Sequence, residues 1–293
     1  TESRVQDPII PLSLFRNPIF VNATAIGLVL GIGMFAAIGF VPTFLQMSSG
    51  TSAAASGLLM IPMMVGLMGT SIFSGIAISK TGKYKVYPIV GTIITGLAMV
   101  AFTTLSASTP IWLICVFLFF FGAGLGLIMQ VVVLVVQNAV PAGEIGTATS
   151  TNNYFREVGA SLGTAVFGTL FTTRLTENLL GVFGGAGASP EEAAQAASTI
   201  DPATLSALPD EVRDGIVTAY ADALAPVFWY LVPFIAVALL LSLLLKQIPL
   251  SDQAGLVARG EAISGEEAER LEAEQRGLSG SSARTDAGDT SGR

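Results

Sequence analysis

The chain has 293 residues, of which 52% are hydrophobic and only 12% are charged, and its formal net charge is −7. A soluble domain carries about 25% charged residues, so this composition excludes an ordinary soluble fold. Between positions 17 and 173 the charged side chains are Lys80, Lys83, Lys85, Glu144, Arg156 and Glu157. The acidic balance comes from residues 174–223 and from the segment after Leu250, so it points to no nucleic-acid partner.

Histidine and cysteine usage narrows the function classes further. The chain has no His and a single Cys, Cys115, which lies in an apolar run. These counts exclude disulfides, imidazole metal sites and Ser-His-Asp catalysis. We therefore expect no enzyme activity, no metal and no cofactor, and we expect Cys115 to face lipid or to pack. The chain opens with Thr1 and lacks a signal-peptide pattern, so we expect it to continue a longer protein.

The first elements in chain order are a connector and three apolar spans. Residues 1–17 contain Arg4 and Arg16 and predict a cytoplasmic connector at the membrane surface. The apolar runs predict transmembrane helices at about residues 18–46, 53–79 and 87–105. Pro62 predicts a kink in the second helix because it lacks a backbone N–H. The next loop carries Lys80, Lys83 and Lys85 and is therefore predicted to be cytoplasmic.

A helical hairpin follows, with transmembrane helices predicted at residues 110–138 and 147–173. Small and polar residues gather on one side of its first arm, which predicts that this side faces protein or water and not lipid. These residues are Gly122, Gly126, Gln130 and Gln137. In the second arm Gly159 and Gly163 predict a second helix-packing seam.

The hairpin also holds the candidate functional side chains. Gln130, Gln137, Asn152 and Asn153 are candidate polar residues of a cavity or an interface, and hydrogen bonding between helices is the alternative. Arg156 and Glu157 are the only adjacent charges in any predicted span. Counting back from Arg174 places them near the cytoplasmic interface, where they form a structural clamp or act in coupling or gating.

The rest of the chain adds a loop, a helix and a tail. Residues 174–223 predict an extracytoplasmic acidic loop with short helices, one of which starts at Ser189. Residues 224–246 predict the sixth transmembrane helix, and residues 247–293 a cytoplasmic, largely disordered tail. The predicted fold is therefore an all-α membrane protein of six transmembrane helices with both ends in the cytoplasm. Its spans group as two sets of three, as in transporters built from inverted repeats.

Several short motifs resemble a known family. They are Pro11-Leu12-x-Leu14-Phe15-Arg16-Asn17, Gly122-x-Gly124-x-Gly126, Gln137-Asn138-x-Val140-Pro141, Gly146-x-Ala148 and Phe155-Arg156-x-x-Gly159-x-x-x-Gly163. Over residues 8–248 the chain resembles the fourteen-helix drug/proton antiporter branch of the major facilitator superfamily. The hairpin resembles the twelfth and thirteenth helices of that branch. The resemblance implies the C-terminal bundle of a major facilitator fold, without the helices that precede it.

A further motif lies in the loop that carries the lysines. It reads Gly75-x-x-x-Ser79-Lys80-x-Gly82-Lys83-Tyr84-Lys85 and resembles the cytoplasmic motif of the superfamily. The family motif has Asp at the place of Ser79 and Arg at the place of Lys80, which puts charge-relay gating through Ser79 in doubt. What the resemblance implies here is a positional role for Lys80 and Gly82 at a helix–helix contact.

The resemblance implies the C-terminal half of a secondary active exporter of drugs or metabolites in the plasma membrane. It implies proton-coupled antiport by alternating access, with no transport by this chain alone. The partners implied are the lipid bilayer, the N-terminal half of the same transporter, a small amphipathic substrate and a proton. The alternative is a non-transporting six-helix membrane protein that acts as a scaffold or pairs with a separately encoded half-transporter.

Overall fold

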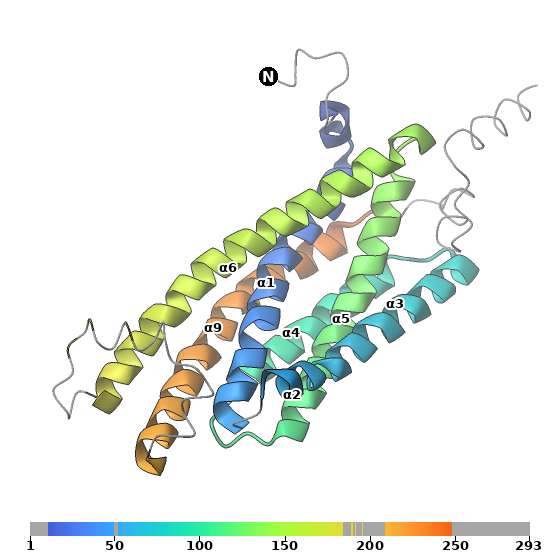
Figure 1. The fold of residues 1–293 in the computed structure, drawn as a ribbon. Coiled ribbons are helices and arrows are strands. Elements are labelled where there is room, and N and C mark those ends of the chain that lie inside the picture. Colours follow the sequence, from blue (N-terminus) through green and yellow to red (C-terminus); the bar gives the residue numbers. More distant parts are fainter. Residues whose placement is uncertain are drawn as a thin grey trace, which may run out of the picture.

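The computed structural model describes residues 11–49, 52–183, 189, 191, 195 and 209–247 (Figure 1). In chain order the elements are η2 Leu12–Arg16, α1 Pro18–Ser49, α2 Ala53–Leu58, α3 Ile61–Thr81, α4 Val86–Phe102, α5 Ile111–Asn138, η3 Ala142–Glu144, α6 Ile145–Phe183 and α9 Asp210–Leu244. The described residues contain no strand. The start of the predicted connector, most of the predicted short helices after Ser189 and nearly all of the predicted tail lie outside the described residues.

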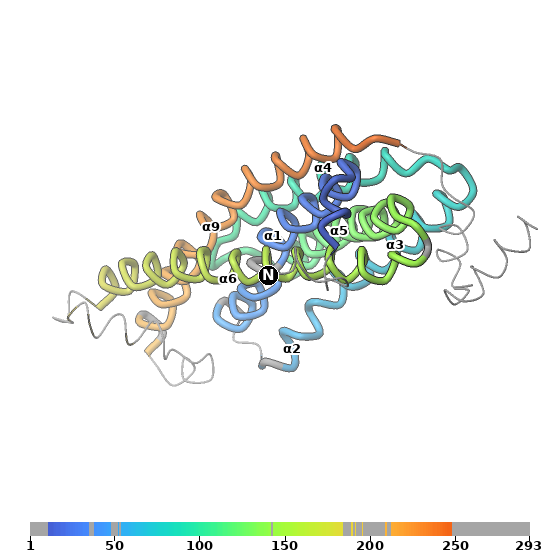
Figure 2. Tube along the Cα trace, turned by 90° about the horizontal axis from the view of Figure 1, so that it is seen from above, coloured from blue at the N-terminus to red at the C-terminus, as the bar shows by residue number. Residues whose placement is uncertain are grey.

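The long helices lie side by side in an elongated bundle (Figures 1 and 2). Four stretches are long and apolar enough to cross a membrane, namely Pro18–Met47, Ala54–Thr81, Ile111–Asn138 and Val212–Leu244. α4 is a shorter apolar helix of 17 residues. α6 is long, at 39 residues, but does not reach the same apolar character. The prediction of an all-α membrane bundle is confirmed.

The helices pair in a pattern that repeats within the bundle. α1 packs against α6 and α9, and α5 packs in the same way against α3 and α4. α1 also contacts α5, and α4 contacts α9. Exchanging α1 with α5, α3 with α6 and α4 with α9 therefore maps these contacts onto one another, whereas the contact between α6 and α9 has no counterpart of similar extent between α3 and α4. This is the pairing expected of two three-helix repeats within one bundle.

The α1–α6 contact brings two helix backbones together. A methyl group added at Gly31 would clash with the carbonyl oxygen of Arg156, and one added at Gly159 would clash with that of Leu28. Gly163 meets the backbone of α1 in the same way, one turn further along α6. Small residues let helices approach closely in a membrane, where packing replaces the hydrophobic effect as the force between them.

The α3–α5 contact is built in the same way. A methyl group at Gly122 would clash with the carbonyl oxygen of Met63, and one at Gly126 would clash with another backbone carbonyl of α3. The Thr70 hydroxyl lies in this contact and donates to the carbonyl oxygen of Ala123 at 2.8 Å. The side of α5 that carries these glycines therefore packs against α3.

Aromatic side chains join α4 to α5 and α9. Phe102 of α4 lies 5.7 Å from Phe121 of α5 and 5.1 Å from Phe228 of α9, measured between ring centroids. All three side chains are fully buried. This cluster holds α4 between α5 and α9.

The second predicted span differs from the structure near its start. The chain forms a short α2, turns at Leu59 and Met60, and then begins α3 with Pro62 in the first turn. A proline in the first turn removes no intrahelical hydrogen bond. Pro62 therefore starts a helix here and does not kink one.

The helices around the predicted acidic loop are longer than expected. α6 continues to Phe183 and α9 runs without a break from Asp210 to Leu244, whereas the sequence predicts an acidic loop with separate short helices over residues 174–223. The two extensions pack against each other, because Asn178 donates from Nδ2 to the carbonyl oxygen of Ala219 at 3.0 Å. The polar segments at the end of α6 and the start of α9 are thus helical because the two helices pack against each other there.

Replacing Gly122 with Ala is expected to destabilise the bundle. The added methyl group would overlap a backbone oxygen that cannot move independently of α3, at a cost of about 1–3 kcal/mol. The measurement is the unfolding temperature of the purified chain in nanodiscs. Gly69→Ala is the matched control, because no atom lies within 4 Å of the position of its added methyl group. Equal unfolding temperatures for the two variants would show that the α3–α5 contact tolerates wider spacing.

Candidate functional site

The predicted polar residues of α5 lie at two different helix contacts. Gln130 is half-buried and faces α3, since a methyl group added at Gly75 would lie 3.9 Å from its Nε2 atom. Gln137 lies at the C-terminal end of α5, and its Nε2 donates to the Thr149 hydroxyl of α6 at 3.5 Å. Both amides therefore lie where α5 meets another helix.

Asn152 and Asn153 are neighbours in sequence but differ in burial. Asn152 is 2% exposed and lies over Gly27 of α1, where an added methyl group would sit 3.1 Å from its Oδ1 atom. Its Oδ1 has no hydrogen-bond partner within the described part of the protein. Asn153 is half-buried on the next side of the helix. Asn152 is thus a residue of the α1–α6 contact, while Asn153 is the partly accessible one.

Arg156 and Glu157 form a direct ion pair between Nη2 and Oε1, at 3.3 Å. The Glu157 side chain is 55% exposed and the Arg156 side chain 21% exposed. The Arg156 Nε atom is buried and finds no hydrogen-bond partner among the described residues. The pair joins adjacent residues of one helix, so it does not clamp α6 to another helix.

Asn152 and Arg156, together with Thr24 and Gly27 of α1, form what we call the polar seam. Thr24 is 5% exposed, lies on the same side of α1 as Gly27, and its hydroxyl has no hydrogen-bond partner in the described chain. Polar atoms buried without partners are costly, most of all where the surroundings are apolar. The polar seam therefore has two acceptors and a cationic donor available for hydrogen bonding.

The other side of α6 is exposed and is formed largely by small and hydroxyl side chains. It carries Ser150, Ser161, Thr164, Ala165, Thr169 and Thr173, together with the exposed larger side chains of Tyr154, Leu162 and Val166. Some hydroxyls bond to their own helix, as when Thr169 donates to the carbonyl oxygen of Ala165 at 2.8 Å. The exposed face of α3 is different, because it presents large apolar side chains such as Met68 and Phe73. The exposed face of α6 is thus more polar than the exposed face of α3, whose side chains are typical of a lipid-facing helix.

The residues of the lysine loop have distinct roles. Gly82 ends α3 with φ +67°, and its N–H donates to the carbonyl oxygen of Ile78 at 2.8 Å. A left-handed conformation of this kind favours glycine at the end of a helix. No atom lies within 4 Å of a methyl group added at Gly82, and Lys80 and Lys83 are exposed. Gly82 is therefore a helix cap and does not lie in the helix–helix contact that the resemblance implies.

Tyr84 connects this loop to the end of the bundle's last helix. It is fully buried, and its hydroxyl donates to the carbonyl oxygen of Lys246 at 2.8 Å. The partner lies 162 positions away along the chain, so sequence reasoning did not find this contact.

Asn17 is another residue whose role the sequence reveals only in part. Its Oδ1 accepts from the N–H of Ile19 at 2.9 Å, and its Nδ2 donates to the carbonyl oxygen of Ala139 at 2.7 Å. One side chain therefore caps the start of α1 and also holds the end of α5. The Asn17-Pro18 pair indicates the first bond, but nothing in the sequence indicates the second.

The predicted site residues do not converge on one pocket. They lie at the α3–α5 contact, the α5–α6 contact and the polar seam. No group of three or more His, Cys, Asp or Glu side chains is arranged to hold a metal ion among the described residues. The arrangement offers hydrogen bonding and shape along α5 and α6, which suits recognition more than bond chemistry.

Comparison with known proteins gives a family for this arrangement. The family described as Major Facilitator Superfamily matches residues 2–164. An MFS-type transporter of Mycobacterium tuberculosis is 39% identical over 251 residues, covering 86% of this chain and 36% of that protein. The "Multidrug transporter protein MdtP" of Bacillus subtilis is 33% identical over 273 residues, covering 86% of this chain and 50% of that protein.

A third relative is the "Tetracycline resistance determinant" of Streptomyces rimosus. It is 33% identical over 173 residues, which cover 59% of this chain and 50% of that protein. The chain thus spans half the length of these relatives, or less.

Substitutions at Asn17 can separate its two hydrogen bonds. Asn17→Asp keeps the acceptor for Ile19 and removes the donor to Ala139, whereas Asn17→Ala removes both. We expect the Asp variant to lose about 1 kcal/mol of stability and the Ala variant about 2 kcal/mol. The measurement is the unfolding temperature in nanodiscs at neutral pH. If Asn17→Asp matches the unsubstituted chain, the bond to α5 does not contribute to stability.

Proposed function

This chain belongs to the Major Facilitator Superfamily, and from that premise we propose that it forms one six-helix half of a secondary active exporter. In this proposal it is the C-terminal bundle of a fourteen-helix drug/proton antiporter of the plasma membrane. The N-terminal half supplies the opposite wall of the substrate path, and transport occurs as the two halves rock against each other. The loop that carries Lys80, Lys83 and Lys85 faces the cytoplasm, together with both chain ends.

The observation that carries this proposal is the exposed face of α6. A helix that crosses the bilayer with hydroxyl and small side chains on one side needs protein or water against that side. The described chain covers the opposite side of α6 with α1 and α9 and leaves this side exposed. A second half that meets this face, with a water-filled path between the two, satisfies the requirement.

The repeated pairing of helices supports the same proposal. Transporters built from repeats bind substrate near the middle of the membrane, where the repeats meet. In this bundle α5 belongs to one repeat and packs against α1, α3 and α4 of the other, and α5 carries Gln130 and Gln137. We propose that Gln130, Gln137 and the partly accessible Asn153 contribute polar contacts to the substrate path.

The substrate class follows from the side chains available. The described helices offer scattered amides and hydroxyls in apolar surroundings, without a fixed ionic clamp, which suits amphipathic compounds of varied shape. Relatives named as a multidrug transporter and as a tetracycline resistance determinant agree with this class. Because Glu157 is ion-paired with Arg156, we propose that the carboxylate that carries protons lies in the N-terminal half.

The size of the native product tests whether the chain acts as one half of a longer transporter. An antibody raised against residues 251–293 is used to probe native membranes. We expect a band near twice the 30.3 kDa of this chain. A band at 30.3 kDa would instead favour a separate half, and a co-purifying membrane protein of similar size would then identify its partner.

Substitutions on α6 test the role of its exposed face in the whole transporter. Ser161→Leu places a bulky side chain on the hydroxyl face, and we expect at least about tenfold slower efflux because positioning of the halves is disturbed. Val166→Leu is the control, since Val166 is also exposed on α6 and its side chain is already apolar. Ethidium efflux is measured from cells with equal amounts of transporter. Equal efflux by the two variants would remove the hydroxyl face from the transport path.

A further inference from the structure

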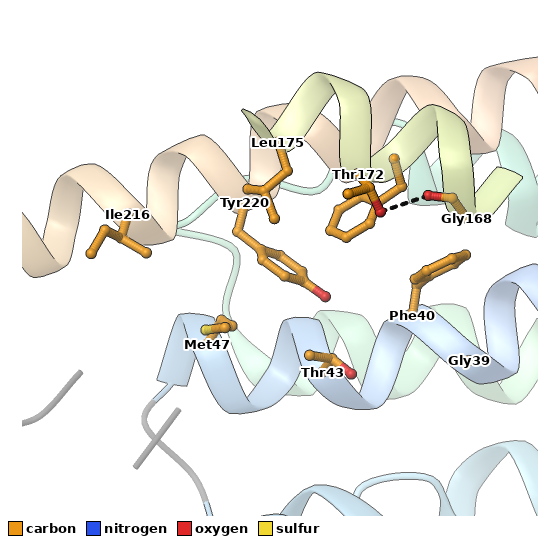
Figure 3. Close-up of a pocket in the computed structure, with 10 residues that line it drawn as sticks. Gly39, Phe40, Thr43, Met47, Gly168, Thr172, Leu175, Ile216 and Tyr220 are labelled. Atoms are coloured by element: carbon orange, nitrogen blue, oxygen red, sulfur yellow. Dashed lines mark hydrogen bonds between the residues drawn. The ribbon is translucent and has the colours of Figure 1, made fainter. Parts of the chain in front are cut away.

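A pocket of about 320 Å³ lies between α1, α6 and α9 (Figure 3), at the end of the bundle opposite the loop that follows α3 (Figure 1). It lies within this one bundle, on the side of α6 that faces α1 and α9. It is separate from the polar seam because the residues that line it lie further along α1 and α6, and all of its described lining residues belong to this bundle. Pockets of this size accommodate small organic molecules.

Three aromatic rings from three helices line one wall of the pocket. The ring of Phe171 on α6 lies 5.1 Å from the ring of Phe40 on α1 and 4.9 Å from the ring of Tyr220 on α9, between centroids. Tyr220 is only 4% exposed, and its hydroxyl points toward Thr43 at the pocket (Figure 3). The wall thus combines aromatic faces and edges with one polar group.

Two glycines leave room beside this wall. No atom lies within 4 Å of a methyl group added at Gly39, and one added at Gly168 would meet only the edge of Phe40, at 3.8 Å. The Thr172 hydroxyl donates to the carbonyl oxygen of Gly168 at 2.9 Å, so it is engaged with its own helix (Figure 3). The polar groups that face the space are the hydroxyls of Tyr220 and Thr43.

We propose that this pocket binds an uncharged aromatic molecule that carries a hydrogen-bond acceptor. Aromatic rings pack favourably against Phe40, Phe171 and Tyr220 in offset or edge-to-face geometry. Among the described residues no charged side chain lines the pocket, so none of them would compensate the charge of an ion bound there. The Tyr220 hydroxyl is hydrogen-bonded to Thr43, and when the Thr43 hydroxyl is the donor in that bond, the Tyr220 O–H can donate to a carbonyl group of the ligand, which a saturated lipid chain does not offer. The proposal stands independently of the proposed transport.

Benzophenone is the probe, because it has two uncharged rings and one carbonyl group and forms covalent adducts on irradiation. The full chain in phosphatidylcholine nanodiscs is irradiated with benzophenone, and the adducts are located by peptide mass spectrometry. We expect them to concentrate on the segments that line the pocket, above all at Met47. Adducts spread evenly over the lipid-facing side chains would overturn the proposal.

A matched pair of glycine variants tests the pocket itself. Gly39→Leu fills the space, and we expect adduct yield at the pocket to fall at least about tenfold. Gly69→Leu is the control, because Gly69 is also exposed and also has no atom within 4 Å of an added methyl group. We expect it to leave the yield unchanged. An equal yield in both variants, or a phospholipid held by the unsubstituted chain and lost from Gly39→Leu, would overturn the proposal.

Competition tests the hydrogen bond without filling the pocket. Diphenylmethane has the same two rings but no carbonyl group. Against labelled benzophenone as the probe, we expect diphenylmethane to compete about fivefold more weakly than unlabelled benzophenone does. In Tyr220→Phe the two competitors should become equal. If diphenylmethane and unlabelled benzophenone compete equally well for the unsubstituted chain, the pocket does not select for a hydrogen-bond acceptor and the proposal fails. Folding of each variant is checked by its unfolding temperature.

Discussion

The structure depends on direct contact between helix backbones at three places, α1 with α6, α3 with α5, and α4 with α5. At each contact a glycine lies against a carbonyl oxygen of the facing helix, as Gly159 does against Leu28 and Gly122 against Met63. In a membrane the hydrophobic effect does not draw helices together, so close packing must do so. The aromatic cluster around Phe102 also joins α4 to α5 and α9.

Close backbone contact also determines where polar side chains can lie. Thr70 donates across the α3–α5 contact, whereas Thr24, Asn152 and Arg156 at the α1–α6 contact each have a polar atom without a partner in the described part of the chain. The two contacts correspond under the exchange of helices that relates the two repeats. The Thr70 hydroxyl is nevertheless hydrogen-bonded across its contact, whereas the α1–α6 contact contains polar atoms without partners in the described chain. That difference makes the polar seam the part of the packing where a rearrangement of α1 and α6 could add hydrogen bonds.

α6 connects this packing to function because its two sides have different requirements. The side with Gly159 and Gly163 must touch α1, while the side with Ser161 and Thr164 must meet protein or water. A helix under both constraints cannot rotate without losing one of them. The aromatic pocket near Tyr220 lies beyond this region, where α6 has left its glycine contact with α1 and the helices leave space between them.

The sequence by itself determined the fold class and the family, because membrane helices need long apolar runs and because the family motifs lie close together along the chain. It also identified the glycines, but their spacing indicates only that one face of the helix carries small side chains. The tertiary structure decided that Gly122 meets α3. The difference between buried Asn152 and half-buried Asn153 arises from rotation about one helix axis, which depends on the neighbouring helix. Tyr84 with Lys246, and Phe40 with Phe171 and Tyr220, come together only in the folded chain, since no local pattern encodes contacts between residues so far apart.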